Sequence, residues 1–151
     1  VVLRSKRGIV VPVEKTLGQE GHVVLNISVL QDDHMILGPE KTGRMVDAFF
    51  DNAGKKVEQL AQAVSGRDWS TVAYIAHNLK GSAASLGLSA LEHHAEHLEG
   101  YAKKENGEGI SERFESFISL FEQSVATLRA YWMKLDGGEV PQRSETSAAN
   151  M

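Results

Sequence analysis

The run from Tyr74 to Gly87 places a histidine, a lysine and a glycine at spacings that could support nucleophilic chemistry. On a helical wheel the predicted helix that contains this run has one apolar stripe, made of Val72, Ile75, Ala76, Leu79, Ala83 and Leu86. His77 lies almost opposite that stripe, so its ring should face solvent. Lys80 and Gly81 follow it by three and four residues, which makes them its neighbours on a helix surface. The spacing therefore predicts an exposed imidazole beside a mobile cation.

Imidazole has a reference pKa of about 6.5 and offers a neutral, nucleophilic nitrogen near pH 7. A lysine one turn away could offset the negative oxygens of an added phosphoryl group. Small residues also surround His77, because Ala73 precedes it by one turn and Gly81 and Ala84 follow it. Glycine inside a helix costs roughly 0.5 to 1 kcal/mol relative to alanine, so Gly81 suggests that open space is needed there.

Five helical segments are predicted from apolar periodicity and from capping residues. They cover about residues 27–37, 39–64, 69–86, 90–104 and 112–135. The signals at their starts are Asn26 or Ser28, Pro39, Asp68, Ser89 with Glu92 as a capping box, and Ser111. Four long amphipathic helices with short connections are typical of a bundle. The predicted fold is all-α, an antiparallel four-helix bundle with a short additional N-terminal helix.

The two ends of the chain lack a sustained helical or strand period. Residues 1–24 are predicted to be a linker or terminal segment, residues 25–136 the helical domain, and residues 137–151 a flexible C-terminal tail. The chain begins with Val1, which suggests a fragment of a longer polypeptide.

Charge and composition exclude several classes of function. The net charge of -4 provides no basic surplus for a phosphate backbone, so nucleic acid is not an expected partner. The absence of cysteine excludes disulfides and thiolate metal sites and fits a reducing compartment, so we expect a cytoplasmic location. No stretch of the sequence suits a membrane span, and direct membrane contact is not expected.

The fourth predicted helix contains His93-His94-Ala95-Glu96-His97, a literal H-x-x-E-H motif of zinc peptidases. His93 and His97 could share a metal ion, with Glu96 as a general base. The apolar stripe of this helix, however, places both histidines on the solvent side, where no third ligand can be identified. We interpret them as surface histidines and expect no metal site. The run Lys103-Lys104-Glu105 is interpreted as a solvated helix end.

The stretch Ala76-His77-Asn78-Leu79-Lys80-Gly81-Ser82-Ala83, followed by Leu86-Gly87, resembles the pattern of histidine phosphotransfer domains. It matches A-H-x-L-K-G-[SA]-[SA]-x-x-[LVI]-G at every specified position, and the resemblance extends over about residues 25–135. It implies that His77 is the phospho-acceptor, that Lys80 stabilises the phosphoryl charge and that Gly81 provides steric clearance. The expected partner-binding surface consists of Ala73, His77, Lys80, Gly81 and Ala84.

The resemblance implies a phosphorelay intermediary of two-component signal transduction. Such a module accepts a phosphoryl group from a receiver-domain aspartate and passes it to the aspartate of a response regulator. The isolated chain is then a phosphocarrier rather than an enzyme. No dedicated dimer seam is evident in the sequence, so we expect a monomer. It needs no cofactor of its own, because Mg²⁺ is expected on the partner receiver domain.

These domains often form the C-terminal module of hybrid sensor histidine kinases. Residues 30–50 resemble the module of trimethylamine N-oxide sensor kinases, which would place this chain at the cytoplasmic end of a membrane-bound kinase. The alternative function is a helical protein-interaction adaptor that transfers no phosphate.

Overall fold

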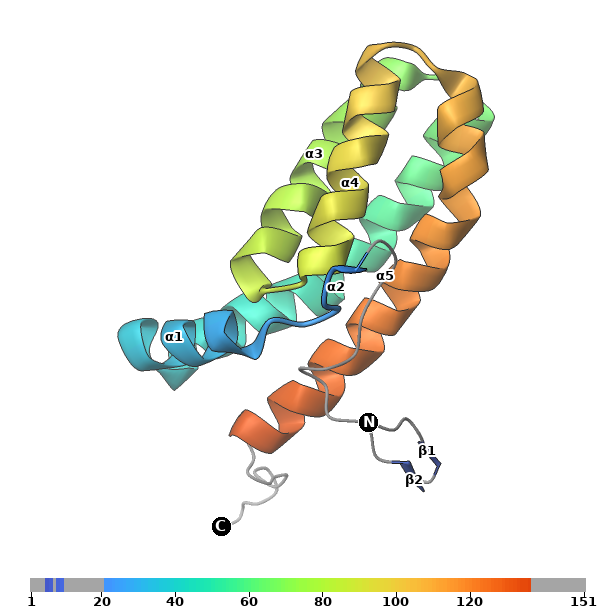
Figure 1. The fold of residues 1–151 in the computed structure, drawn as a ribbon. Coiled ribbons are helices and arrows are strands. Elements are labelled where there is room, and N and C mark those ends of the chain that lie inside the picture. The colour runs from blue at the N-terminus through green and yellow to red at the C-terminus, as the bar shows by residue number, and fades with distance from the viewer. Residues whose placement is uncertain (1–4, 7, 10–20, 137–151) are drawn as a thin grey trace.

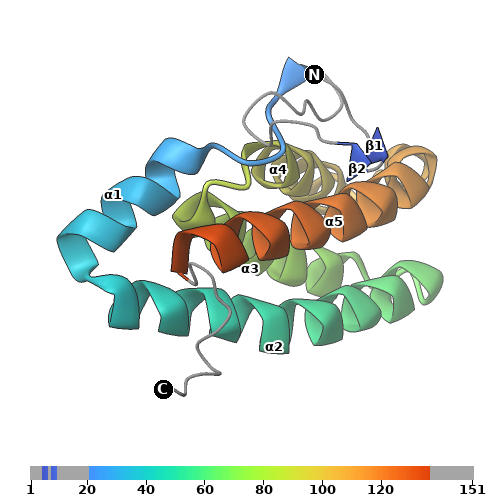
Figure 2. The same ribbon diagram turned by 90° about the horizontal axis from the view of Figure 1, so that it is seen from below.

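The computed structural model describes residues 5, 6, 8, 9 and 21–136, and five helices lie in this part of the chain. They are α1 (Ile27–Leu37), α2 (Pro39–Ser65), α3 (Trp69–Leu86), α4 (Ser89–Lys103) and α5 (Gly107–Asp136). The long helices α2 to α5 form an antiparallel bundle, and α1 crosses the end at which α3 passes into α4 (Figures 1 and 2). The predicted all-α bundle with an additional N-terminal helix is confirmed.

Two short strands precede the helices. β1 (Ser5–Lys6) pairs in antiparallel fashion with β2 (Gly8–Ile9). The predicted tail at 137–151 lies outside the described residues. Within the described part of the chain, no helix is long and apolar enough to cross a membrane.

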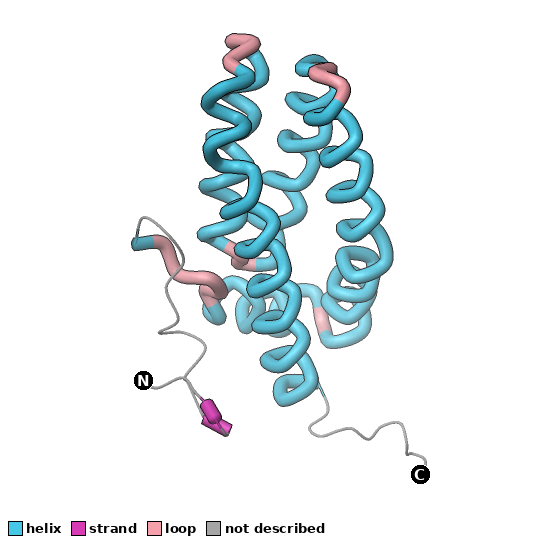
Figure 3. Tube along the Cα trace, turned by 90° about the vertical axis from the view of Figure 1, so that its right-hand side faces the viewer, coloured by secondary structure: helices cyan, strands magenta, loops and turns pink. Residues whose placement is uncertain are grey.

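Short connections join the helices of the bundle, as the tube view shows (Figure 3). Side-chain caps begin two of the helices. The Asn26 side chain accepts a hydrogen bond from the backbone N–H of Ser28, and Asp68 accepts one from Thr71. Gly87 ends α3 in the left-handed conformation at φ 78°, which glycine adopts without strain.

Two predicted helix starts are wrong. Ser89 lies inside α4, which has no side-chain cap at Leu88, so the capping box does not form. Helix α5 begins at Gly107, four residues before the predicted cap at Ser111. The side chain of Asn106 instead accepts a hydrogen bond from Gly109 N at 2.9 Å, which stabilises an earlier first turn.

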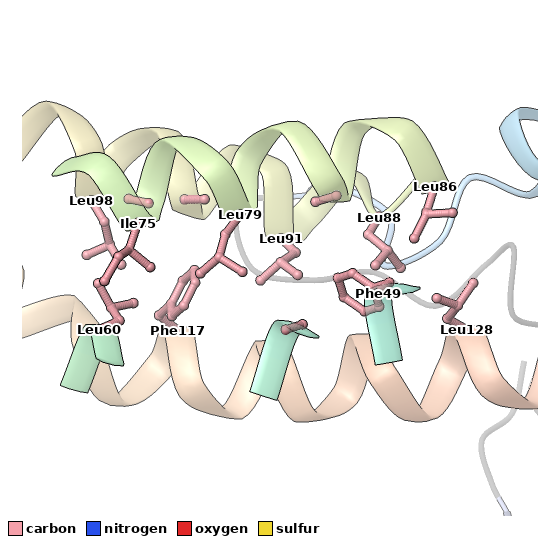
Figure 4. Close-up of a cluster of buried hydrophobic side chains, with 14 of the residues drawn as sticks. Phe49, Leu60, Ile75, Leu79, Leu86, Leu88, Leu91, Leu98, Phe117 and Leu128 are labelled. Carbon is pink, nitrogen blue, oxygen red and sulfur yellow. The ribbon is translucent and has the colours of Figure 1, made fainter. Parts of the chain in front are cut away.

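The core fixes the rotation of α3 about its own axis. All six residues of its predicted apolar stripe are buried, which confirms that prediction. Ile75 and Leu79 point from α3 towards Leu60 of α2 and Phe117 of α5 (Figure 4). Burial of each large apolar side chain contributes about 1.5 to 3 kcal/mol, so α3 cannot turn His77 inward without losing these contacts.

The packed domain begins before residue 25. Val24 and Leu25 are fully buried, although residue 24 falls in the segment predicted to be a linker. Two backbone hydrogen bonds hold this segment against the bundle. One runs from Asn26 N to Gly87 O, in the connection between α3 and α4, and the other from Ala90 N, in the first turn of α4, to Val23 O. The approach is close, because a Cβ atom at Gly87 would lie 2.5 Å from the carbonyl oxygen of Asn26.

Candidate functional site

His77 lies on the outward side of α3, and its side chain is 64% exposed. Its Nδ1 atom is 3.1 Å from Oε2 of Glu99, a residue of the adjacent helix α4. An ionised carboxylate only accepts hydrogen bonds, so the Nδ1 atom must donate. This hydrogen bond favours the tautomer in which the other ring nitrogen, Nε2, keeps its lone pair. The site thus presents an oriented nucleophile on an exposed surface.

Glu99 is a buried carboxylate, only 6% exposed, and it is surrounded by cations. Lys80 Nζ lies 3.0 Å from Oε1, and Lys103 Nζ lies 3.0 Å from Oε2. Burial by itself would raise the pKa of the Glu99 carboxyl. The ammonium groups of Lys103 and Lys80 outweigh that effect and lower the pKa from 4.5 to about 2. Glu99 is therefore ionised throughout the neutral pH range.

Glu99 was not among the site residues predicted from the sequence. One signal was present, because Glu99 lies four residues after Ala95 and three before Ala102, on the edge of the apolar stripe of α4. A carboxylate at such a position requires a partner, since an unpaired buried charge is costly. Two of its partners, Lys80 and His77, come from α3, 19 and 22 residues earlier, and only the packing of the two helices brings them to Glu99. The third, Lys103, lies four residues later on α4 itself.

Lys80 is a structural residue as well as a candidate for binding a phosphoryl group. Its side chain is 28% exposed and forms an ion pair with Glu99, so Lys80 is not the mobile cation that the spacing predicted. The hydrogen bond to Glu99 raises the pKa of Lys80, so the lysine stays protonated. Lys103, interpreted from the sequence as part of a solvated helix end, also pairs with Glu99.

The predicted small residues leave the surface around His77 open. Gly81 and Ala84 are exposed, and Ala73 is half-buried. A Cβ atom built at Gly81 would meet no heavy atom within 4 Å, and the φ of this glycine is not positive. Neither packing nor backbone conformation therefore requires glycine at position 81.

His93 and His97 of α4 are less exposed than the surface histidines that the sequence predicted. His94 is buried, and His93 and His97 are half-buried, with a centroid distance of 4.3 Å between the last two rings. The ring of His22 stacks on His93 at 4.0 Å, which covers this part of the helix. Glu96 is exposed. Within the described ranges, no three His, Cys, Asp or Glu side chains form a group that could hold a metal ion.

A family model for the Hpt domain matches residues 44–131. The chain belongs to the Hpt domain family. The match covers α3, α4 and most of α2 and α5, and it includes His77, Lys80 and Gly81. It confirms the predicted resemblance to histidine phosphotransfer domains. Hpt domains are phosphocarriers of two-component signalling that interact with receiver domains and response regulators. No curated protein and no solved structure matches the chain.

Proposed function

We propose that this Hpt domain carries a phosphoryl group on His77 between the aspartate of a receiver domain and the aspartate of a response regulator. The observation that supports this most directly is the hydrogen bond between His77 Nδ1 and Glu99. It orients an exposed ring within the Hpt motif and favours the lone pair on Nε2.

Transfer requires no proton to leave the ring. The Nε2 lone pair attacks the phosphorus atom of the aspartyl phosphate, a P–N bond forms, and the P–O bond to the aspartate breaks. The aspartate leaves as a carboxylate, while Nδ1 keeps its proton and Glu99 accepts the strengthened hydrogen bond. Lys80 offsets charge on the phosphoryl oxygens, and the space beside Gly81 admits the incoming aspartate. We expect Mg²⁺ on the partner receiver domain and no cofactor on this chain.

The proposed partner-binding surface comprises Ala73, His77, Lys80, Gly81 and Ala84. The exposed ring of Tyr74, 70% accessible, lies beside it. A transient contact centred on this side of α3 should bury less than about 1,200 Å². We further propose that the domain acts as a monomer at the cytoplasmic end of a hybrid sensor kinase. The resemblance of residues 30–50 to trimethylamine N-oxide sensor kinases supports that context.

The test uses receiver domains charged with acetyl phosphate, mixed with the Hpt domain and analysed under alkaline conditions. The wild-type chain should acquire an acid-labile phosphoryl group, and His77→Gln should acquire none while it keeps the wild-type circular dichroism. His97→Gln is the matched control on α4 and should accept phosphate normally. If the receiver domain binds but neither the wild-type chain nor any variant is labelled, the chain is an adaptor and the proposal fails.

A further inference from the structure

The charge balance around Glu99 assigns a role to a residue that lies outside the motif around His77. We propose that Lys103 of α4 is a second phosphoryl-binding cation, which supplies the positive charge that Lys80 alone cannot. This inference rests on the proposed phosphorylation of His77.

Lys80 is already neutralised in the resting site. Its ammonium group pairs with the buried carboxylate of Glu99. The positive charge of Lys80 and the negative charge of Glu99 cancel, so this pair has no net charge. Glu99 cannot relieve this balance by taking up a proton near neutral pH, because its pKa lies at about 2. A phosphoryl group carries about -1.5 to -2 charges and would meet a site that offers it no net attraction. The ammonium group of Lys103 provides the missing charge.

Geometry places Lys103 within reach of the acceptor ring. Its Nζ atom and the Nδ1 atom of His77 contact the same oxygen, Oε2 of Glu99, at 3.0 and 3.1 Å. Because both atoms contact one oxygen, the ammonium group of Lys103 lies close to the imidazole ring of His77. Lys103 comes from α4 and His77 from α3, so the cation approaches the ring from the neighbouring helix.

The side chain of Lys103 is also more exposed to solvent than that of Lys80, at 67% against 28%. A lysine side chain is a flexible chain of four carbons that ends in a charged ammonium group. Rotation about its bonds can move the ammonium group of Lys103 from Glu99 towards a phosphoryl group on Nε2 of His77. Lys80 then keeps its ion pair with Glu99, so the buried carboxylate does not lose both of its lysine partners at once.

The primary experiment measures the equilibrium constant for phosphoryl exchange between one charged receiver domain and the Hpt domain, at concentrations where the two are dissociated. Under these conditions docking affinity cancels, so a change reports the stability of phosphorylated His77. Lys103→Gln should lower this constant roughly two- to fivefold, the scale of an exposed charge interaction. Lys103→Arg keeps the positive charge, so its equilibrium constant should stay near the wild-type value. Lys104→Gln removes the same charge from the next exposed residue and should leave the constant unchanged.

A second measurement needs no receiver. Proteins are phosphorylated with potassium phosphoramidate, and the ³¹P resonance that is missing from His77→Gln is titrated. Lys103→Gln should shift protonation of the phosphoryl oxygens to higher pH, because a neighbouring cation favours the dianion, and Lys104→Gln should not. Equal behaviour of Lys103→Gln and Lys104→Gln in both measurements overturns the role of Lys103. A wild-type chain that no charged receiver phosphorylates instead overturns the proposed function, while the ³¹P titration still decides the role of Lys103.

Discussion

The ion pair between Lys80 Nζ and Glu99 Oε1 spans 3.0 Å and joins α3 to α4 beside the exposed ring of His77. One buried carboxylate thus serves two purposes. It orients the imidazole, and it pairs with the lysine that lies one helical turn after His77. Substitutions at these positions should therefore change both the stability of the bundle and the chemistry of the ring.

Replacing Glu99 by alanine should remove the control of the imidazole tautomer. Without the carboxylate, the proton of His77 is no longer held on Nδ1, and Nε2 loses its lone pair in part of the population. Phosphoryl transfer should slow, and ¹⁵N imidazole spectra should show a larger fraction of the Nε2–H tautomer than in the wild type. Glu96→Ala, an exposed glutamate of the same helix, is the control. Identical tautomer ratios in all three proteins would contradict this role of Glu99.

The stability of the domain should depend on pH through Glu99. The folded-state pKa of about 2 lies below the ordinary value of 4.5, so ionised Glu99 stabilises the folded state. This contribution is complete above pH 4.5 and is lost as pH falls towards 2. Urea unfolding between pH 3 and pH 7 should show a steeper decline for wild type than for Glu99→Gln. Parallel curves would show that the carboxylate contributes nothing to stability.

Lys80 should contribute to folding as well as to phosphoryl transfer. Lys80→Ala leaves Glu99 buried with one fewer cation, so we expect the free energy of unfolding to fall. A double-mutant cycle with Glu99→Gln isolates the ion pair and should give a positive coupling energy. Additive effects of the two substitutions would mean that the contact contributes no stability. Lys80→Ala should also transfer phosphate more slowly than wild type.

Gly81 should separate stability from transfer. Alanine at this position gains up to about 1 kcal/mol of helix propensity, and a Cβ atom there meets open space. Gly81→Gln should therefore melt no lower than wild type but should exchange phosphate much more slowly, because its side chain occupies the space of the incoming aspartate. Gly81→Ala should show an intermediate defect in exchange. Full transfer by Gly81→Gln would refute the steric explanation, and unfolding of this variant would indicate a packing role.

The orientation of His77 was predictable because a single helix determines it. The apolar stripe of α3 faces the core, so a residue almost opposite the stripe must be exposed. Glu99 was not predictable in the same way, since its contact with His77 depends on how α4 is placed and rotated against α3. The start of α5 was mispredicted because asparagine and glycine are common both in loops and at helix ends. Asn106 and Gly107 are compatible with a loop, but the side chain of Asn106 caps the helix.

The close contact between Gly87 and Asn26 bears on how short a functional version of this domain can be. The family match begins at residue 44, yet Val24, Leu25 and Leu30 are fully buried and precede it. A truncation that starts at residue 44 would uncover the apolar surface beneath these side chains and would delete the hydrogen bond from Asn26 N to Gly87 O. The minimal folding unit is therefore larger than the segment that the family model matches, and an autonomous fragment should retain the chain from His22 onwards.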